Sequence, residues 1–229
     1  MALQTIVIAT IRPWNIKRFK GWKPPSGYRK VLIERKEDLT YERLRKLDPA
    51  YVFFPHWSWL IPADIFENFN CILFHMTDLP FGRGGSPMQN LIVRGVYKTK
   101  VSAIKLEAGL DTGPVYLKKP LDLSKGSAQE LFEKLSALCF SMAKEIIAKK
   151  LKPKAQIGTP VIFKRRSPEE SAIPTNLTPR QLYDFIRMLD AEGYPHAFTR
   201  HGEYLVEFTQ AKLDDQIVTA KATFTKPKK

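Results

Sequence analysis

Short apolar runs alternate with amphipathic segments through the first two thirds of the chain. The runs at residues 5–10, 28–34 and 71–75 predict buried strands, and a further strand begins at residue 50 in AYVFFP. Leucines at helical spacing in residues 39–47 predict a helix that ends before Asp48-Pro49. Strands that alternate with helices are typical of an α/β domain with a mostly parallel, Rossmann-type sheet.

The second half of the chain carries a different pattern. Residues 88–95 predict a short helix, residues 101–123 two strands around a turn, and residues 127–150 a long amphipathic helix whose Ser127 and Glu130 form a capping box. Beyond residue 153 we expect a small α+β appendage. It has a helix that starts near Thr178-Pro179, a hairpin that turns at His201-Gly202, and a final strand over residues 216–224. The sequence thus predicts two parts, residues 1–153 and 154–229.

Charge and composition narrow the functional classes only slightly. Lys and Arg exceed Asp and Glu by 37 to 23, which gives a net charge of +14. This charge suits nucleic acid, polyglutamylated folate or a sugar nucleotide, but scattered lysines also serve solubility. Cys71 and Cys139 lie in apolar runs and are interpreted as reduced core thiols. The start of the chain has no secretory pattern and no apolar stretch reaches ~18 residues, so we expect a cytoplasmic protein without a membrane partner.

Several reaction classes have no signature in this sequence. The first strand is followed by IATIRPWN, which lacks the glycines of a dinucleotide fingerprint. No Cys/His cluster has metal-ligand spacing and no GxSxG elbow is present, so neither a metal nor a nucleophilic serine is expected.

One constellation could carry acid–base chemistry. His75 ends a predicted strand, the loop LPFGRGGSP follows it, and Asp111 comes 36 residues later in the turn AGLDTGP. In open α/β sheets, ligands bind at the carboxyl ends of the strands. An imidazole beside a carboxylate suits proton transfer to or from an amine near neutral pH. By themselves, a histidine at a strand end and a DTG turn are also compatible with purely structural roles.

These residues resemble a known motif. LFHMTDLPFGRGGSP and the downstream GLDTGP are similar to the Asn-x-His-x-Ser-x-Leu-Pro, Arg-Gly and Leu-Asp-Thr-Gly segments of the 10-formyltetrahydrofolate-dependent formyltransferase family. The family includes methionyl-tRNA, glycinamide ribonucleotide and amino-sugar N-formyltransferases. The resemblance is strongest over residues 75–121 and extends weakly over residues 5–158. The sequence of the loop looks most like that of the branch that formylates nucleotide-linked 4-amino sugars of pseudaminic-acid-type pathways.

The resemblance implies a set of site residues. His75 and Asp111 fall on the family's catalytic positions. The residues implied for binding the donor, 10-formyltetrahydrofolate, are Trp59, Leu60, Arg83, Gly84, Gly109 and Leu110. The residues implied for the acceptor are Thr77, Gly85 and Lys100.

One position departs from the family's pattern. Leu73 stands where the family has its catalytic asparagine, and leucine cannot donate a hydrogen bond to an oxyanion. Asn90 is the preferred substitute. Asn70 would serve only if the strand register shifted.

The resemblance implies an enzyme that moves a formyl group from 10-formyltetrahydrofolate to an amine, without a metal. We expect a UDP-linked 4-amino-4,6-dideoxy sugar as acceptor, because the 76 residues after Pro153 are too few for a tRNA-recognition domain. On this interpretation the partner is a small nucleotide sugar, with no nucleic acid, and a homodimer is possible. The alternatives are a formyltransferase that acts on methionyl-tRNA or glycinamide ribonucleotide, and a non-catalytic folate-binding protein.

Overall fold

The structure is a computed structural model that describes residues 2–226. These residues form two compact units. The first contains residues 2–84, Thr99–Leu121 and Glu133–Ile162, and the second contains Gly85–Lys98, Asp122–Phe132 and residues 163–226. The division of the chain at residue 153 stays a prediction.

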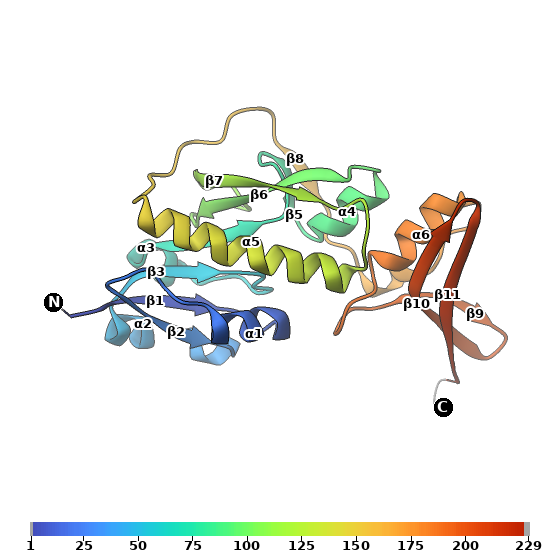
Figure 1. Ribbon diagram of the computed structural model, residues 1–229, viewed down its shortest axis with the longest axis horizontal. Coiled ribbons are helices and arrows are strands. Elements are labelled where there is room, and N and C mark those ends of the chain that lie inside the picture. The colour runs from blue at the N-terminus through green and yellow to red at the C-terminus, as the bar shows by residue number, and fades with distance from the viewer. Residues whose placement is uncertain (1, 227–229) are drawn as a thin grey trace. The chain divides into compact units, whose positions relative to one another are not determined.

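A six-stranded sheet forms the centre of the first unit, in the order β2-β1-β3-β4-β6-β7 (Figure 1). The strands are β1 (Gln4–Ala9), β2 (Tyr28–Ile33), β3 (Pro49–Phe54), β4 (Cys71–His75), β6 (Lys98–Lys105) and β7 (Val115–Asp122). β1 pairs in parallel with β2 and β3, and β3 with β4, whereas β6 runs antiparallel to β4. The prediction of a mostly parallel α/β sheet is confirmed. Two short strands, β5 (Phe81–Gly84) and β8 (Val161–Phe163), pair separately.

Alternation along the strands builds the core beneath this sheet. Val7, Val52 and Phe54 point to one face, where they pack with Leu44 of α2 (Tyr41–Leu47) and Ile65 of α3 (Ala63–Asn68). All five side chains are buried, and every second strand residue shares this face because the side-chain period of a strand is two. The 3-10 turn η1 (Lys36–Asp38) precedes α2.

The helix α1 (Pro13–Gly21) is absent from the sequence-based prediction, because its polarity is mixed. Pro13 occupies the first turn, where the missing N–H costs nothing. At the other end, the ammonium group of Lys30 donates to the carbonyl oxygens of Phe19, Lys20 and Trp22, at 2.6, 3.0 and 2.6 Å. A cation contributed by a neighbouring strand thus satisfies the last carbonyls of the helix, which local sequence could not indicate.

The long helix α5 (Ala128–Ala148) begins with the predicted capping box. The Ser127 N–H donates to the Glu130 carboxylate at 2.8 Å, and the Glu130 N–H donates to the Ser127 hydroxyl at 3.3 Å. Cys139 on this helix and Cys71 on β4 are buried free thiols, and burial raises the pKa of Cys71 to about 12. Among residues 2–226, no helix is both long and apolar enough to cross a membrane.

The second unit combines helices with an antiparallel sheet. Its elements are α4 (Pro87–Val93), η2 (Pro168–Ser171), α6 (Pro179–Arg187), β9 (Ala197–His201), β10 (Tyr204–Asp214) and β11 (Ile217–Thr225). Thr178 and Gln181 form a capping box at the start of α6, as the predicted start at Thr178-Pro179 requires. β9 and β10 pair across the turn at His201-Gly202, so the predicted hairpin is confirmed.

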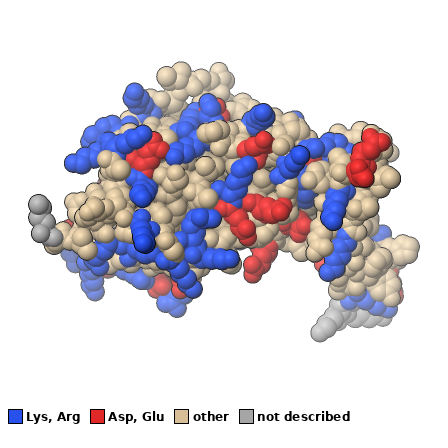
Figure 2. Space-filling view, viewed as in Figure 1, with Lys and Arg blue, Asp and Glu red and all other residues tan. Residues whose placement is uncertain are grey.

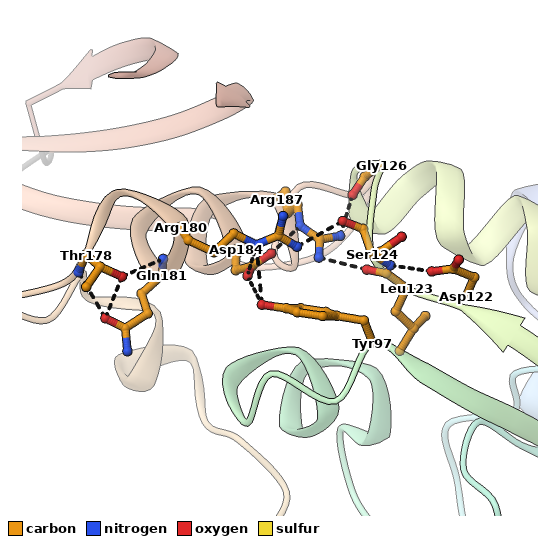
Figure 3. A network of polar contacts seen from close by, with 10 residues as sticks. All are labelled: Tyr97, Asp122, Leu123, Ser124, Gly126, Thr178, Arg180, Gln181, Asp184 and Arg187. Atoms are coloured by element: carbon orange, nitrogen blue, oxygen red, sulfur yellow. Dashed lines mark hydrogen bonds and ion pairs between the residues drawn. The ribbon is translucent and has the colours of Figure 1, made fainter. Parts of the chain in front are cut away.

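A buried ion pair joins three separate stretches of this unit (Figure 3). Arg187 is 1% exposed, and its guanidinium donates to Asp184 at 2.6 Å and to the carbonyl oxygens of Leu123 and Gly126 at 2.7 and 2.9 Å. The other carboxylate oxygen of Asp184 accepts from Tyr97 and Arg180, at 2.6 and 2.8 Å. These hydrogen bonds offset the cost of desolvating the buried charge.

We predict that Asp184→Ala lowers the free energy of unfolding by about 3–5 kcal/mol, because it leaves the Arg187 cation buried without its carboxylate. Urea denaturation checks this, with the exposed Arg200→Ala as control, for which a change within about 0.5 kcal/mol is expected. A loss below 1 kcal/mol for Asp184→Ala would contradict the role given to this pair.

Candidate functional site

His75 is the last residue of β4 and its side chain is only 6% exposed. Its Nε2 donates to the carbonyl oxygen of Gly82 at 2.7 Å, and its Nδ1 lies 3.5 Å from Oδ2 of Asp111. A neutral imidazole carries a single N–H, which the Gly82 carbonyl can only accept. With that N–H on Nε2, Nδ1 can donate to the Asp111 carboxylate only if the ring carries a second proton.

The Asp111 carboxylate is held in place by an unusual turn. Asp111 has a positive φ of 52° and its side chain is 7% exposed. Its Oδ2 also accepts the backbone N–H of Gly84 at 2.9 Å. Two residues on, a Cβ at Gly113 would lie 1.8 Å from the carbonyl oxygen of Lys105, so only glycine fits. The DTG segment thus aims the aspartate at His75 and at the loop after β4.

Gln156 joins the two loops of this site. Its Oε1 accepts from Nε and Nη2 of Arg83 at 3.2 and 2.8 Å, and its Nε2 donates to the carbonyl oxygens of Asp111 and Gly113, both at 2.8 Å. One amide side chain therefore satisfies four contacts across two loops. Sequence reasoning missed Gln156, because it lies in an irregular segment with no motif around it.

Thr77 and Lys100 were expected to bind the acceptor, but their side chains support the loop. The buried Thr77 hydroxyl donates to the Gly82 carbonyl at 3.2 Å, the same oxygen that His75 contacts. The ammonium groups of Lys100 and Lys118 lie 3.0 and 2.6 Å from the carboxylate oxygens of Asp78. Burial alone would raise the pKa of Asp78, but the two lysines outweigh it and hold that pKa below its ordinary value. Acceptor binding by Thr77 and Lys100 stays a prediction.

The aromatic loop after β3 presents apolar surface. Trp59 is exposed and packs edge-on against Trp57 at 5.2 Å, while Leu60 is 91% exposed. The buried indole N–H of Trp57 has no hydrogen-bond partner among residues 2–226. Exposed Leu110 and Gly109, whose φ is 102°, belong to the turn before Asp111. These side chains could cover a flat ring, and the Trp57 N–H could meet an acceptor on it.

His56 belongs to the same loop but cannot act as a proton carrier near neutral pH. Desolvation of the ring, together with the nearby Arg12 cation, lowers its pKa to about 3. His75 is therefore the histidine of this region that suits acid–base chemistry.

Asn90 and Gly85 lie in the second unit. The Asn90 amide nitrogen faces three carbonyl oxygens, of Gly85, Ser86 and Lys164, at 3.0, 3.1 and 2.9 Å, and its Oδ1 accepts from Arg94. In this conformation both amide hydrogens are engaged by backbone. A Cβ at Gly85 would lie 2.4 Å from Cβ of Arg165, so glycine is required for packing there.

β4 keeps the register that leaves Leu73 at the position of the family's asparagine. Leu73 pairs with Ile104 and shares the face of His75. Asn70 precedes the strand, where its side chain contacts Ala50 and Tyr116. The structure thus brings together His75, Gly84 and Asp111, but no asparagine side chain replaces Leu73 within β4.

Among residues 2–226, no group of three or more His, Cys, Asp or Glu side chains is placed to hold a metal ion.

Known formyltransferases resemble this chain in sequence and in fold. The model for "Methionyl-tRNA formyltransferase, C-terminal domain" matches residues 168–225. The solved methionyl-tRNA formyltransferase from Clostridium thermocellum is 46% identical, with a TM-score of 0.95 over 98% of this chain and 100% of that chain. A 4-N formyltransferase from Francisella tularensis is 15% identical, with a TM-score of 0.67 over 92% of this chain and 99% of that one, and so shares the fold alone.

Curated relatives match over shorter stretches. The methionyl-tRNA formyltransferase of Thermodesulfovibrio yellowstonii is 29% identical over 159 residues, which cover 66% of this chain and 52% of the relative. That of Nitratiruptor is 33% identical over 140 residues, which cover 56% of this chain and 45% of the relative. The chain thus spans about half the length of these relatives.

The expectation of an amino-sugar acceptor without a nucleic-acid partner is contradicted. The 46% identical structure bears the name of a tRNA-modifying enzyme, whereas the 4-N formyltransferase shares only the fold. The C-terminal segment that seemed too short for a tRNA-recognition domain matches the C-terminal domain model of the methionyl-tRNA enzymes. The error came from judging that segment by its length, although α6 and three paired strands give it a compact structure.

The 46% identity to the Clostridium thermocellum protein, over 98% of this chain and 100% of that one, shows that this chain belongs to the formyltransferase family.

Proposed function

We propose that this chain transfers a formyl group from 10-formyltetrahydrofolate to the amino group of methionyl-tRNA. The observation that carries the proposal is the 46% identity to a methionyl-tRNA formyltransferase over nearly the whole of both chains. The match of residues 168–225 to the C-terminal domain of those enzymes supports the same acceptor.

The proposed chemistry is direct acyl transfer. The substrate amine attacks the formyl carbonyl and forms a tetrahedral intermediate. Its collapse breaks the bond between the formyl carbon and N10 of the folate, which takes up a proton and leaves as tetrahydrofolate, while the substrate keeps the formyl group as a formamide. His75 donates a hydrogen bond to the developing oxyanion through Nε2, after exchanging its Gly82 partner for the substrate oxygen. Catalytic hydrogen bonds often form only when the substrate is bound, so the closed arrangement is compatible with this role. Asp111, whose carboxylate lies at the Nδ1 side of the ring, accepts the amine proton, directly or through water.

The donor is proposed to lie against the aromatic loop. Exposed Trp59, Leu60 and Leu110 supply apolar cover, and the buried Trp57 N–H supplies a donor that a pterin ring atom can satisfy. Arg12 supports this loop from the end of β1, because its guanidinium donates to the Ser58 hydroxyl at 3.2 Å. Tetrahydrofolic acid appears in a solved complex of HypX from Aquifex aeolicus, a protein that shares this fold at 14% identity.

The missing asparagine leaves His75 as the principal oxyanion donor. Leu73 has no donor, and the amide hydrogens of Asn90 are engaged by backbone carbonyls. Asn90 remains a proposed contributor only if the loop opens and frees its amide.

We predict that His75→Ala and Asp111→Ala each lower turnover by at least ~100-fold, because each removes one proton-transfer or oxyanion partner. Single-turnover formylation of methionyl-tRNA measures the effect, and circular dichroism confirms the fold. A folded variant with near-normal turnover would show that the assigned roles are wrong.

We further predict that Gln156→Leu lowers kcat by about 10- to 100-fold while KM for the donor changes less than threefold. The substitution keeps the side-chain size but releases Asp111 and Arg83, and small misplacements of catalytic groups have large effects on rate. The exposed Gln216→Leu is the matched control and should behave as wild type. An unchanged kcat, or a loss that falls entirely on KM, would contradict the positioning role.

The acceptor is tested by measuring catalytic efficiency on methionyl-tRNA, glycinamide ribonucleotide and UDP-linked 4-amino sugars with 10-formyltetrahydrofolate as donor. We expect efficient formylation of methionyl-tRNA and none of the small amines at comparable concentrations. If a small amine is formylated and methionyl-tRNA is inert, the proposed acceptor is wrong while the folate chemistry stands.

A further inference from the structure

A groove of about 870 Å³ runs between α1 and α5 in the first unit, and the proposed chemistry does not use it. Its walls come from one side of each helix. Small side chains at Gly21, Ala137 and Ala148 leave it open, and a Cβ at Gly21 would meet nothing within 4 Å.

The groove is lined by cations from both helices. Lys17, Arg18 and Lys23 come from α1 and its end, and Lys144 comes from α5. None of these four makes an ion pair among residues 2–226. Figure 2 shows Lys and Arg side chains over α1 and beside the middle of α5. An open groove that holds unpaired cations attracts a polyanion.

One of the two acidic residues on the groove wall is already neutralised. The carboxylate oxygens of Glu145 lie 2.8 and 2.7 Å from the ammonium groups of Lys119 and Lys149. Hydrogen bonds from these lysines lower the pKa of Glu145 to about 2, so it stays ionised and paired at neutral pH. Glu133 is the second acid on the wall, so the lining carries four cations and two acids and keeps a positive balance.

Aromatic rings form the floor between these charges. Trp22 is half-buried and packs edge-on against Phe140, with ring centroids 5.5 Å apart. Aromatic rings beside a cationic track are the arrangement with which proteins hold single-stranded nucleic acid, because bases stack on the rings while phosphates meet the cations. An acidic peptide would use the charges but would not need the half-buried Trp22 ring.

We propose that the α1–α5 groove is a docking surface for a segment of RNA, with phosphates held by Lys17, Arg18, Lys23 and Lys144 and a base stacked against Trp22. The inference rests on the proposed function, which supplies an RNA substrate. The proposed contact region is built by the first unit. It contains none of the residues 168–225 that match the C-terminal domain model.

The test measures the binding of fluorescein-labelled methionine tRNA to the full chain by fluorescence anisotropy. The salt concentration is varied from about 50 to about 300 mM, because the affinity of phosphate contacts falls steeply in this range. Lys17→Glu/Lys144→Glu reverses one charge on each wall. We expect Kd to rise at least about tenfold at low salt. The negative slope of log affinity against log salt should become shallower by about 1.4–1.8, because two phosphate contacts are lost. Trp22→Ala should weaken binding about tenfold, whereas Trp22→Phe should retain most of it.

The matched control is Lys46→Glu/Lys152→Glu, which reverses two exposed charges of the same unit that do not line the groove. If this control weakens binding as much as the groove variant, binding depends on net charge alone and the proposal fails. It also fails if the groove variant binds as wild type.

Formylation assays separate this inference from the proposed function. With methionyl-tRNA, the groove variant should raise KM about tenfold and leave kcat within twofold. If wild type does not formylate methionyl-tRNA at all, the proposed function fails, while the anisotropy result still decides the groove. If the variant changes only the KM for a polyglutamylated donor, and not RNA binding, the groove holds the folate tail and the RNA inference is overturned.

Discussion

The buried carboxylate of Asp111 is the contact on which the candidate site depends. It meets Nδ1 of His75 on one side and the backbone N–H of Gly84 on the other, so it fixes the histidine and the following loop together. Such a carboxylate is tolerable in a buried position because it has polar partners there. Its left-handed backbone, and the close approach of Gly113 to β6, restrict the turn to one geometry. Preorganisation at this point is what acyl transfer without a covalent intermediate requires.

Gln156 extends that constraint to a distant part of the chain. After α5 the chain returns beside β7, where Val115 and Lys154 pair through their backbones at 2.7 and 2.9 Å. This pairing brings Gln156 within reach of Arg83 and of the Asp111 turn. An irregular segment thus takes the place of a strand or helix in holding two loops, because its amide supplies donors and an acceptor at once.

The lysine and arginine side chains fall into two groups, those paired within the structure and those without an ion pair among residues 2–226. Several lysines are structural: Lys30 caps α1, Lys100 and Lys118 hold Asp78, and Lys119 holds Glu145. The four cations of the α1–α5 groove make no ion pair among residues 2–226, so structural pairing does not account for this part of the net charge of +14. The total charge therefore says less than the pairing of each cation, and pairing is visible only in three dimensions.

The sequence by itself determined the strand pattern, the parallel α/β class, the capping box at Ser127, the helix start at Thr178-Pro179 and the family, because periodicity, caps and the HMTDLP and DTG segments are local signals. The sequence also placed His75 and Asp111 at the ends of elements that can meet. Only the tertiary structure decided that they do meet, that Gln156 joins their loops, and that Asn90 gives its amide to backbone carbonyls. These contacts join residues far apart in the chain, and their energies depend on burial and distance, which no local pattern encodes.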